Sequence, residues 1–395
     1  MKSRLLIASL VALLTACAQL QTVRPAPASA PPAHLAPAPQ NEIAPAAPLS
    51  SEMQIALLLP ARGPWASSAE SVRDGFFAAV YAQPRRPAVR VYDTGASIDG
   101  LRQAVHRAVN DGARFIIGPL QKDLVAALAS QGTPPVPVLA LNYLEPMQGA
   151  PSSFYQLGLA PEDEARAAAE QAIAGGLRRA AALTPTDNWG ERILAAFSKR
   201  LLELGGELVT SQRYGSVADI SQPIRSLMGI PESEERKAAL ASVLGKLEYD
   251  PRRRDDLDFV FVAAHAEQGR LIIPQLRFNR LGNLPVLATA QVFDTGTGDA
   301  DLSGLRSCDM PMMLGAGGRY AGLRLQLNDT LPGRTREQQR LFALGYDAYQ
   351  LVGFLRNGPL PSGGGFPAAT GDLGMGGNGA ITRTLTCGGL VRSTL

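Results

Sequence analysis

Short apolar runs alternate with longer amphipathic stretches along most of the chain from residue 53 onward. The first series of expected elements is strand 53–60, helix 65–83, strand 88–93, helix 97–112, strand 113–119, helix 120–132 and strand 136–142. Apolar runs of this length between longer helices are typical of βαβ units, whose strands are buried on both faces. The pattern therefore predicts a mostly parallel sheet covered by helices.

A second alternation begins near residue 154. Its expected elements are strand 154–159, helix 160–176, strand 179–185, helix 189–204, strand 206–214, a helical region to about 246, strand 257–264, helix 266–278 and strand 284–290. A long amphipathic helix is expected at 336–356, and a glycine-rich turn between two strands within 369–389. The sequence shows no internal repeat with a period of about 20–50 residues.

The length of the folded region, residues 51–395, favours two lobes. It is more chain than one hydrophobic core usually serves. We assign the first lobe to about 51–150 plus part of the C-terminal region, and the second to about 151–330. Each lobe is then an α/β unit with a mostly parallel sheet flanked by helices. Parallel sheets bind ligands outside the carboxyl ends of their strands, which predicts a cleft there.

Polar and turn-forming residues follow the expected strands, where this cleft would lie. The candidate cleft residues are Arg62, Gly63, Pro64, Asp93, Thr94, Gly118, Pro119, Asn142, Thr186, Asp187, Asn188, Trp189, His265, Thr289 and Gln291. Asp187 or Asn188 could instead cap the helix that follows, because short polar side chains accept hydrogen bonds from its first N–H groups. Trp189 could pack in the core or face the cleft, and His265 could cap a helix or line a loop.

The first sixteen residues have the features of a secretory signal. Two basic residues precede an apolar run at 5–14, and small residues follow it. The run is too short to cross a bilayer of about 30 Å as a permanent helix. The motif LTAC at 14–17 resembles the bacterial lipobox, in which the cysteine, here Cys17, is acylated and becomes the new N-terminus. Ala18 in place of aspartate implies sorting to the outer membrane, facing the periplasm; the alternative is an ordinary signal with an incidental cysteine.

Residues 17–50 are mostly alanine and proline and offer almost nothing to bury. Such a segment cannot offset its ordering entropy, so we expect a semi-extended tether with a reach of roughly 100 Å. Removal of residues 1–16 would leave 36 of the 38 basic side chains against 35 acidic ones. This balance provides no basic field for nucleic acid, so the lipid would have to hold the protein at the membrane.

Motifs that would indicate catalysis or a cofactor are incomplete or misplaced. HAE at 265–267 resembles part of the zinc-deaminase motif, but no Pro-Cys-x-x-Cys follows it. GMGGNG at 374–379 matches a dinucleotide-binding fingerprint but precedes an expected strand instead of a helix. The sequence has three histidines and no Gly-x-Ser-x-Gly nucleophile elbow. We therefore expect no catalytic residue, no metal and no cofactor; hydrolysis by paired carboxylates is left open.

Two other groups of residues have alternative interpretations. Cys308 and Cys387 would lie in an oxidising compartment, where they could form a disulfide or remain two buried free thiols. The segment RRRDDLD mixes three arginines with three acids before an expected strand. Its charges could pair with one another in a solvated loop. Alternatively, Arg252, Arg253 and Arg254 could contact an acidic patch on a partner.

Segments spread over most of the folded region resemble one known family. They include IALLLPARGPWASSAESVRDGFFAA, RFIIGPLQKDLVAAL, FYQLGLAPEDEARAAAEQA, PTDNWGERILAAF, RRRDDLDFVFVAAHAEQGRLIIPQLRF and FALGYDAYQL. The opening strand, loop and helix are similar to type I periplasmic solute-binding proteins. The ordered set, and RRRDDLDFVF above all, resembles more closely the C-terminal domain of the LpoA family, the lipoprotein activators of class A penicillin-binding proteins. The resemblance covers about residues 53–355.

This resemblance implies a two-lobed type I periplasmic-binding-protein-like fold. It also implies an outer-membrane lipoprotein that is not an enzyme but binds a class A penicillin-binding protein and stimulates peptidoglycan cross-linking. Described members carry a large N-terminal helical-repeat domain, whereas only the expected tether precedes the binding fold here. We therefore expect a short form of the family.

A second class of function is a periplasmic solute receptor that closes on an amino acid or similar ligand and delivers it to an ABC importer. Such a receptor needs hydrogen-bond donors for a carboxylate and an acid for an amine. Asp93 with Thr94, or Thr186 with Asp187, could serve, although no dedicated set is evident. In a third class, a small ligand in the cleft would gate activation of the synthase.

Overall fold

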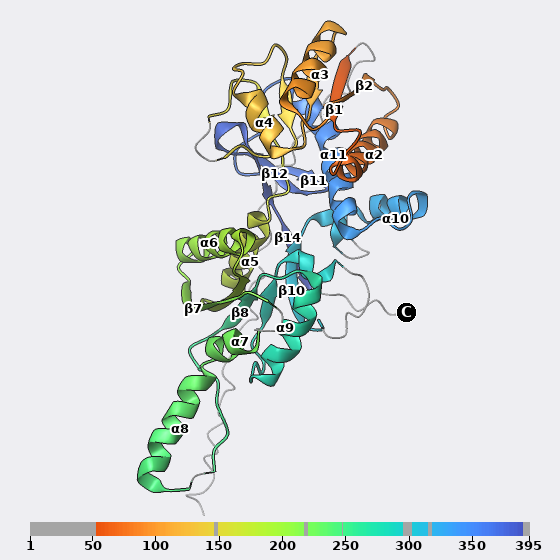
Figure 1. The fold of residues 1–395 in the computed structure, drawn as a ribbon. Helices are drawn as coiled ribbons and strands as arrows, with labels where there is room; N and C mark the ends of the chain where they lie inside the picture. Colours follow the sequence, from red (N-terminus) through yellow and green to blue (C-terminus); the bar gives the residue numbers. More distant parts are fainter. Residues whose placement is uncertain are drawn as a thin grey trace, which may run out of the picture. The chain divides into compact units, whose positions relative to one another are not determined.

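The computed structural model describes residues 53–145, 149–216, 220–246, 248–294, 302–314 and 318–389. The expected signal peptide, Cys17 and the tether lie outside these ranges. The structure confirms an α/β protein with two mostly parallel sheets, to which it adds a small antiparallel sheet (Figure 1). No helix in the described part of the chain is long and apolar enough to cross a lipid bilayer.

The first sheet is parallel throughout, with strand order β2-β1-β3-β4-β5. Its elements in chain order are β1 (Gln54–Leu59), α2 (Ala66–Tyr81), β2 (Ala88–Asp93), α3 (Ile98–Asn110), β3 (Phe115–Ile117), α4 (Lys122–Ala129), β4 (Val138–Ala140) and β5 (Phe154–Gln156). Successive side chains of a strand point to opposite faces. Ile55 and Leu57 therefore pack with α2, whereas Ala56 and Leu58 pack with α3 and α4. This sheet extends a few residues past 150, where we expected the lobe to end.

The second sheet has the order β14-β10-β9-β8-β6-β7, and only β14 is antiparallel to its neighbour. Its strands are β6 (Arg179–Pro185), β7 (Glu207–Tyr214), β8 (Phe259–Val262), β9 (Val286–Ala288), β10 (Leu305–Asp309) and β14 (Thr386–Gly389). Helices α5 (Glu162–Ala174) and α6 (Asn188–Glu203) share one core cluster with this sheet. Helices α7 (Ser221–Leu227) and α9 (Ala266–Phe278) share the other cluster. Burial on both faces explains the continuous apolar runs of these strands.

The remaining elements connect or extend the two sheets. They are α8 (Ile230–Leu244), η2 (Ala290–Phe293), η3 (Pro311–Met313), α10 (Ala321–Thr330), α11 (Arg336–Leu355), β11 (Phe366–Ala368), β12 (Gly371–Met375), η4 (Gly377–Gly379) and β13 (Ile381–Thr384). Strands β11, β12 and β13 form the antiparallel sheet, with the expected glycine-rich turn between β12 and β13. The chain then adds β14 to the second sheet. Strand β10 and helix α10 were not expected from the sequence pattern.

Cys308 and Cys387 stand directly opposite each other in the β10–β14 pair and are joined by a disulfide. The two residues are 79 positions apart in the sequence. The bond therefore fixes the last strand of the described chain to the edge of the second sheet.

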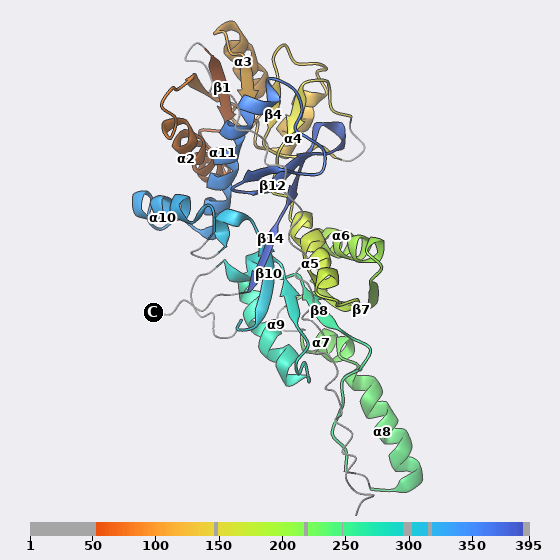
Figure 2. The ribbon, with the colours of Figure 1, turned by 180° about the vertical axis from the view of Figure 1, so that it is seen from behind.

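Helix α11 lies against α2, and both views show the two helices side by side (Figures 1 and 2). Two glycines allow their backbones to approach closely. A Cβ atom on Gly345 would lie 1.8 Å from the carbonyl oxygen of Val72, and one on Gly75 would lie 1.8 Å from that of Phe342. Both positions therefore require a residue without a side chain, and α11 contributes Leu344 and Leu351 to the core of the first sheet through this contact.

We expect Gly345→Ala to lower the free energy of unfolding by at least about 2 kcal/mol, because its methyl group must displace backbone rather than a flexible side chain. Urea denaturation followed by circular dichroism measures this change. Gly322→Ala is the matched control, since Gly322 lies in α10 with no atom near the added Cβ, and alanine there should be neutral or stabilising by about 0.5–1 kcal/mol. Equal stability of Gly345→Ala and the wild type would contradict the close packing.

We also expect the disulfide to stabilise the fold by roughly 4 kcal/mol, the loop-closure entropy of a chain segment of this length. Urea denaturation with and without a reductant measures the difference. The double variant Cys308→Ala and Cys387→Ala should be insensitive to the reductant. A wild type that is equally insensitive would mean that the two thiols are not bonded.

Candidate functional site

A cavity of about 400 Å³ lies at the carboxyl ends of strands in the second sheet. It is lined by Leu159, Pro161, Glu164, Trp189, His265, Gln291, Asp294, Asp309, Met310, Glu337, Arg340, Leu341, Arg383 and Leu385. These residues follow β5, β6, β8, β9 and β10 or belong to α5, β10, α11 and the β13–β14 region. The carboxyl ends of parallel strands are where open α/β sheets bind ligands. The volume falls within the range of about 300–1,000 Å³ that is usual for small-molecule sites.

An aromatic pair forms one wall of this cavity. Asp187 caps α6, because its side chain accepts a hydrogen bond of 2.7 Å from the backbone N–H of Gly190. This cap sets the first turn of α6, which carries Trp189. His265 is the N-cap residue of α9, and its backbone N–H donates to Gln268 Oε1 at 2.8 Å. The rings of Trp189 and His265 are stacked, with centroids 4.6 Å apart.

Glu164, in the first turn of α5, brings a buried carboxyl group to the cavity, with only 8% of the residue exposed. It accepts hydrogen bonds from the backbone N–H of Ala290 at 2.7 Å and from Gln291 Nε2 at 3.3 Å. Burial, reinforced by the nearby negative charge of Asp309, raises the pKa of Glu164 to about 8, although the positive charge of Arg340 opposes this. Near neutral pH this carboxyl group is therefore largely protonated.

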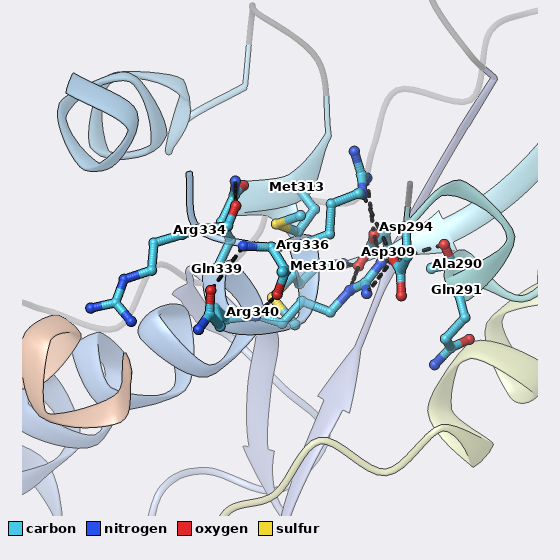
Figure 3. Close-up of polar contacts among 12 residues, drawn as sticks. Ala290, Gln291, Asp294, Asp309, Met310, Met313, Arg334, Arg336, Gln339 and Arg340 are labelled. Carbon is cyan, nitrogen blue, oxygen red and sulfur yellow. Dashed lines mark hydrogen bonds and ion pairs between the residues drawn. The ribbon is translucent and has the colours of Figure 1, made fainter. Parts of the chain in front are cut away.

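A second buried group ties α11 to the cavity (Figure 3). Arg340 contacts Asp309 Oδ2 at 2.9 Å through Nη2 and Asp294 Oδ1 at 2.8 Å through Nη1. Its Nε and Nη2 also donate to Asp309 Oδ1 and to the carbonyl oxygen of Ala290. Burial alone would lower the pKa of this guanidinium, but the two aspartates raise it, so Arg340 stays charged. Replacement of Asp309 would leave the buried guanidinium with the partly exposed Asp294 as its only acidic partner at close range.

Arg383 of β13 forms the third buried group. Its Nε donates to Asp163 Oδ2 at 2.9 Å, and Nη2 contacts the same oxygen at 2.7 Å. Nη2 also donates to the carbonyl oxygen of Ala160, and Nη1 donates to that of Thr370. Within the described ranges, no cluster of three or more His, Cys, Asp or Glu side chains is arranged to hold a metal ion.

The structure brings three of the expected cleft residues to this cavity: Trp189, His265 and Gln291. Thr289 lies buried beside it, where its hydroxyl donates to the carbonyl oxygen of Ala264. Thr186 and Asn188 are exposed at the start of α6, next to the cap Asp187.

The expected cleft residues of the first sheet do not line this cavity. Arg62, Gly63 and Pro64 are exposed after β1, and Asp93 accepts hydrogen bonds from the backbone N–H groups of Ala61 and Gly95. The other four lie within the fold. Thr94 is buried, Gly118 precedes a cis bond to Pro119 and is packed against Leu58, and Asn142 donates to the carbonyl oxygen of Leu120.

Glu164, Asp309, Arg340 and Arg383 were not expected at the site. An acid in the first turn of a helix, such as Glu164, is normally interpreted as a complement to the helix dipole. Arg340 lies in an amphipathic helix, where an arginine can either be exposed to solvent or be buried in an ion pair. The sequence alone does not distinguish the two. The partners of these residues lie far away in the chain, so no local pattern indicates their burial.

The arginines at 252–254 occupy the segment between α8 and β8. Arg254 forms a two-fold contact with Asp256, at 2.6 and 2.7 Å, so it pairs within the loop. Arg253 donates to the carbonyl oxygen of Arg254, and Arg252 is exposed. Helix α8 extends away from the second sheet in both views and exposes Leu240, Val243 and Leu244 near its end (Figures 1 and 2).

Two mostly parallel α/β units with a cavity at the strand ends define the class of type I periplasmic-binding-protein-like folds. The family model "LppC putative lipoprotein" matches residues 8–387. The chain therefore belongs to the LppC lipoprotein family.

Relatives of the chain include proteins named penicillin-binding protein activator LpoA. The one from Vibrio antiquarius is 31% identical over 347 residues, which cover 84% of this chain and 56% of the relative. The one from Pantoea ananatis is 31% identical over 319 residues, which cover 75% of this chain and 46% of the relative. The chain thus spans about half the length of the curated relatives it matches. The expected relationship to the LpoA family is confirmed.

Solved structures share the fold. The C-domain of LpoA from Haemophilus influenzae, described as a regulator of PBP1A, aligns with a TM-score of 0.65 and 23% identity over 85% of this chain and 96% of that domain. A "putative branched-chain amino acid ABC transporter" from Chromobacterium violaceum aligns with a TM-score of 0.66 and 25% identity over 86% of this chain and 100% of that one. Both regulators and transport proteins therefore use this architecture.

The raised pKa of Glu164 predicts a pH-dependent loss of stability. The stabilising contribution of its protonated form is complete below the unfolded pKa near 4.5 and is lost as the pH rises through about 8. Glu164→Gln removes this titration. Between about pH 5 and 9 the wild type should therefore lose on the order of 2–4 kcal/mol of unfolding free energy relative to the variant, since a tenfold change in the dissociation constant corresponds to about 1.4 kcal/mol.

Urea denaturation at a series of pH values measures this difference. Glu207→Gln, a change of the same chemistry at an exposed position on β7, should show no such pH-dependent difference from the wild type. Parallel pH profiles for the wild type and Glu164→Gln would mean that Glu164 ionises normally.

Proposed function

We propose that this protein is held at the periplasmic face of the outer membrane by a lipid on Cys17 and there stimulates a class A penicillin-binding protein. It does so as a regulator rather than an enzyme, and the stimulated reaction is the cross-linking of peptidoglycan. The observation that carries the proposal is the alignment with 96% of the Haemophilus influenzae LpoA C-domain, a regulator of PBP1A. Membership of a lipoprotein family and relatives named as activators support it.

Activation of this kind is a matter of differential affinity. A regulator raises the activity of a synthase only if it binds the active conformation more tightly than the resting one. A coupling free energy of about 1–3 kcal/mol corresponds to a shift of roughly 5- to 150-fold in that equilibrium. Tight binding to both conformations alike would change nothing.

The segment between α8 and β8 is our candidate for the contact with the synthase. Arg252 is exposed, unlike Arg254, whose guanidinium is occupied by Asp256. Leu240, Val243 and Leu244 add exposed apolar surface on α8, with Val243 81% exposed. Arg252 lies near the first turn of α8, where its backbone N–H donates to Ser233 Oγ, and the apolar side chains lie toward the other end of the helix. A basic group and apolar surface along one helix together provide charge complementarity and burial to an acidic, partly apolar partner surface.

The test combines the full-length chain in detergent with the class A synthase of the same organism and its lipid-linked precursor, and it quantifies cross-linked product and binding. We expect direct binding and a several-fold increase in cross-linking. Arg252→Glu should weaken binding by roughly 5- to 10-fold through charge repulsion. Arg85→Glu, at an exposed position before β2, should not.

The absence of both binding and increased cross-linking would refute the activator proposal and favour the solute receptor. Activation that persists with normal affinity in Arg252→Glu would refute only the proposed contact. The two parts of the proposal are therefore tested separately.

A further inference from the structure

A site for anions needs positively charged groups that are free to bind the ligand, and this cavity has none among its two arginines. Arg340 directs its nitrogens at Asp309, Asp294 and a backbone carbonyl. Arg383 directs its nitrogens at Asp163 and two backbone carbonyls. Both arginines that line the cavity thus already form ion pairs and hydrogen bonds within the protein. An incoming carboxylate would have to compete with buried aspartates for them.

Acceptor groups, in contrast, remain available. Glu164 forms no ion pair in the described part of the chain, and its two hydrogen bonds leave part of its acceptor capacity unused. Gln291 Oε1 is buried and accepts no hydrogen bond from any described residue. Because the Nε2 of Gln291 donates to Glu164, its Oε1 and the free carboxylate positions belong to one connected group. Glu337, which also lines the cavity, is exposed and forms no ion pair among the described residues.

The aromatic wall suits a positive charge as well. A cation within about 6 Å of a tryptophan ring is attracted to its face, and a desolvated position strengthens this attraction. Trp189 is partly buried, and its ring is held by the stacked His265. Apolar side chains complete the lining and can cover a carbon chain: Leu159, Met310, Leu341 and Leu385.

We propose that this cavity binds a small organic cation through a protonated primary amino group, which Glu164 and Gln291 Oε1 accept and the Trp189 ring covers. An ammonium group has three N–H donors and no acceptor, which matches a carboxylate, an amide oxygen and an aromatic face. The carbon chain of the ligand contacts the apolar side chains. This binding site goes beyond the proposed regulation of a synthase and does not depend on it.

Binding of such a cation carries a proton signature. A positive charge beside Glu164 favours its ionised form, so the carboxyl group releases its proton when the ligand binds near neutral pH. Several charged or titratable groups face Glu164 or line the same cavity. They are Asp309 on β10, Arg340 and Glu337 on α11, Arg383 on β13, Asp294 after η2 and His265 at the start of α9. Arg340 and Arg383 remain charged and do not supply this proton.

Isothermal titration calorimetry of the full-length chain tests the site with three probes. Cadaverine carries amines only, L-lysine carries amines and a carboxylate, and hexanoate carries a carboxylate only. We expect saturable binding of cadaverine or L-lysine and none of hexanoate. Tighter binding of cadaverine assigns the natural ligand to the polyamines, and tighter binding of L-lysine assigns it to the amino acids or to wall peptides that contain a diamino acid.

Variants locate the interaction. Glu164→Gln should weaken amine binding by at least about 10-fold, since a charge-assisted hydrogen bond is lost. Glu207→Gln on β7 should bind like the wild type. If Glu164→Gln fails to fold, as judged by its thermal unfolding, the wild type decides the question. Titrations near pH 7 in phosphate and in HEPES, which differ in ionisation enthalpy and contain no primary amine, should then show the release of about one proton for each amine bound.

Several results overturn the site. They are the absence of saturable binding by both amines, hexanoate binding as tight as theirs, unchanged affinity in a folded Glu164→Gln variant, or amine binding without proton release. The synthase assay described above measures binding of the synthase and cross-linked product, whereas the calorimetry uses free amines and contains no synthase. Loss of one proposal therefore leaves the other intact, and the two failures can be distinguished.

Discussion

The ion pairs of Arg340 impose a constraint on the second half of the chain. A buried guanidinium is tolerated only while it keeps carboxylate partners, and Arg340 has two, the buried Asp309 and the partly exposed Asp294. Asp309 ends β10, Asp294 follows η2, and Arg340 lies in the second turn of α11. Any arrangement that separated α11 from β10 would therefore break the ion pair between Arg340 and Asp309 and leave both charges buried without each other, or expose them to solvent. The geometry of the cavity depends on this contact.

Helix α11 also contributes to one core cluster of each large sheet. Phe342 and Ala343 pack in the cluster that includes α5 and α6, whereas Leu344 and Ala348 pack in the cluster around α2 and β1. One helix thus carries a residue of the binding cavity, part of each core and the glycine that allows close contact with α2. A change at the cavity that moved α11 would alter side-chain packing in both of these clusters. This coupling is a physical route by which occupancy of the cavity could reach the rest of the protein.

Sequence periodicity located most of the fold but little of the cavity. Helix α9 begins and ends where its amphipathic pattern predicts, at Ala266 and Phe278, because its apolar face packs continuously. Strand β10 was missed, since LRSCD lacks the apolar run of a buried strand. Trp189 and His265 were found because they lie within a few residues of the carboxyl ends of β6 and β8. Arg383 was not found by this reasoning. The carboxylate that compensates its buried charge, Asp163, lies 220 residues earlier, and a local sequence pattern cannot indicate a contact over that separation.

Strand β14 has a consequence for the order of events in folding. The second sheet is complete only when this strand, at the end of the described chain, pairs with β10 and brings Cys387 to Cys308. Contacts between residues so far apart in sequence form late, because the entropy of closing the intervening chain is lost before they become favourable. A chain that emerges N-terminus first can assemble the sheet around β1 early, apart from α11. The edge of β10 stays open until β14 has been made, and that open edge is the point where partly folded molecules are most exposed to aggregation.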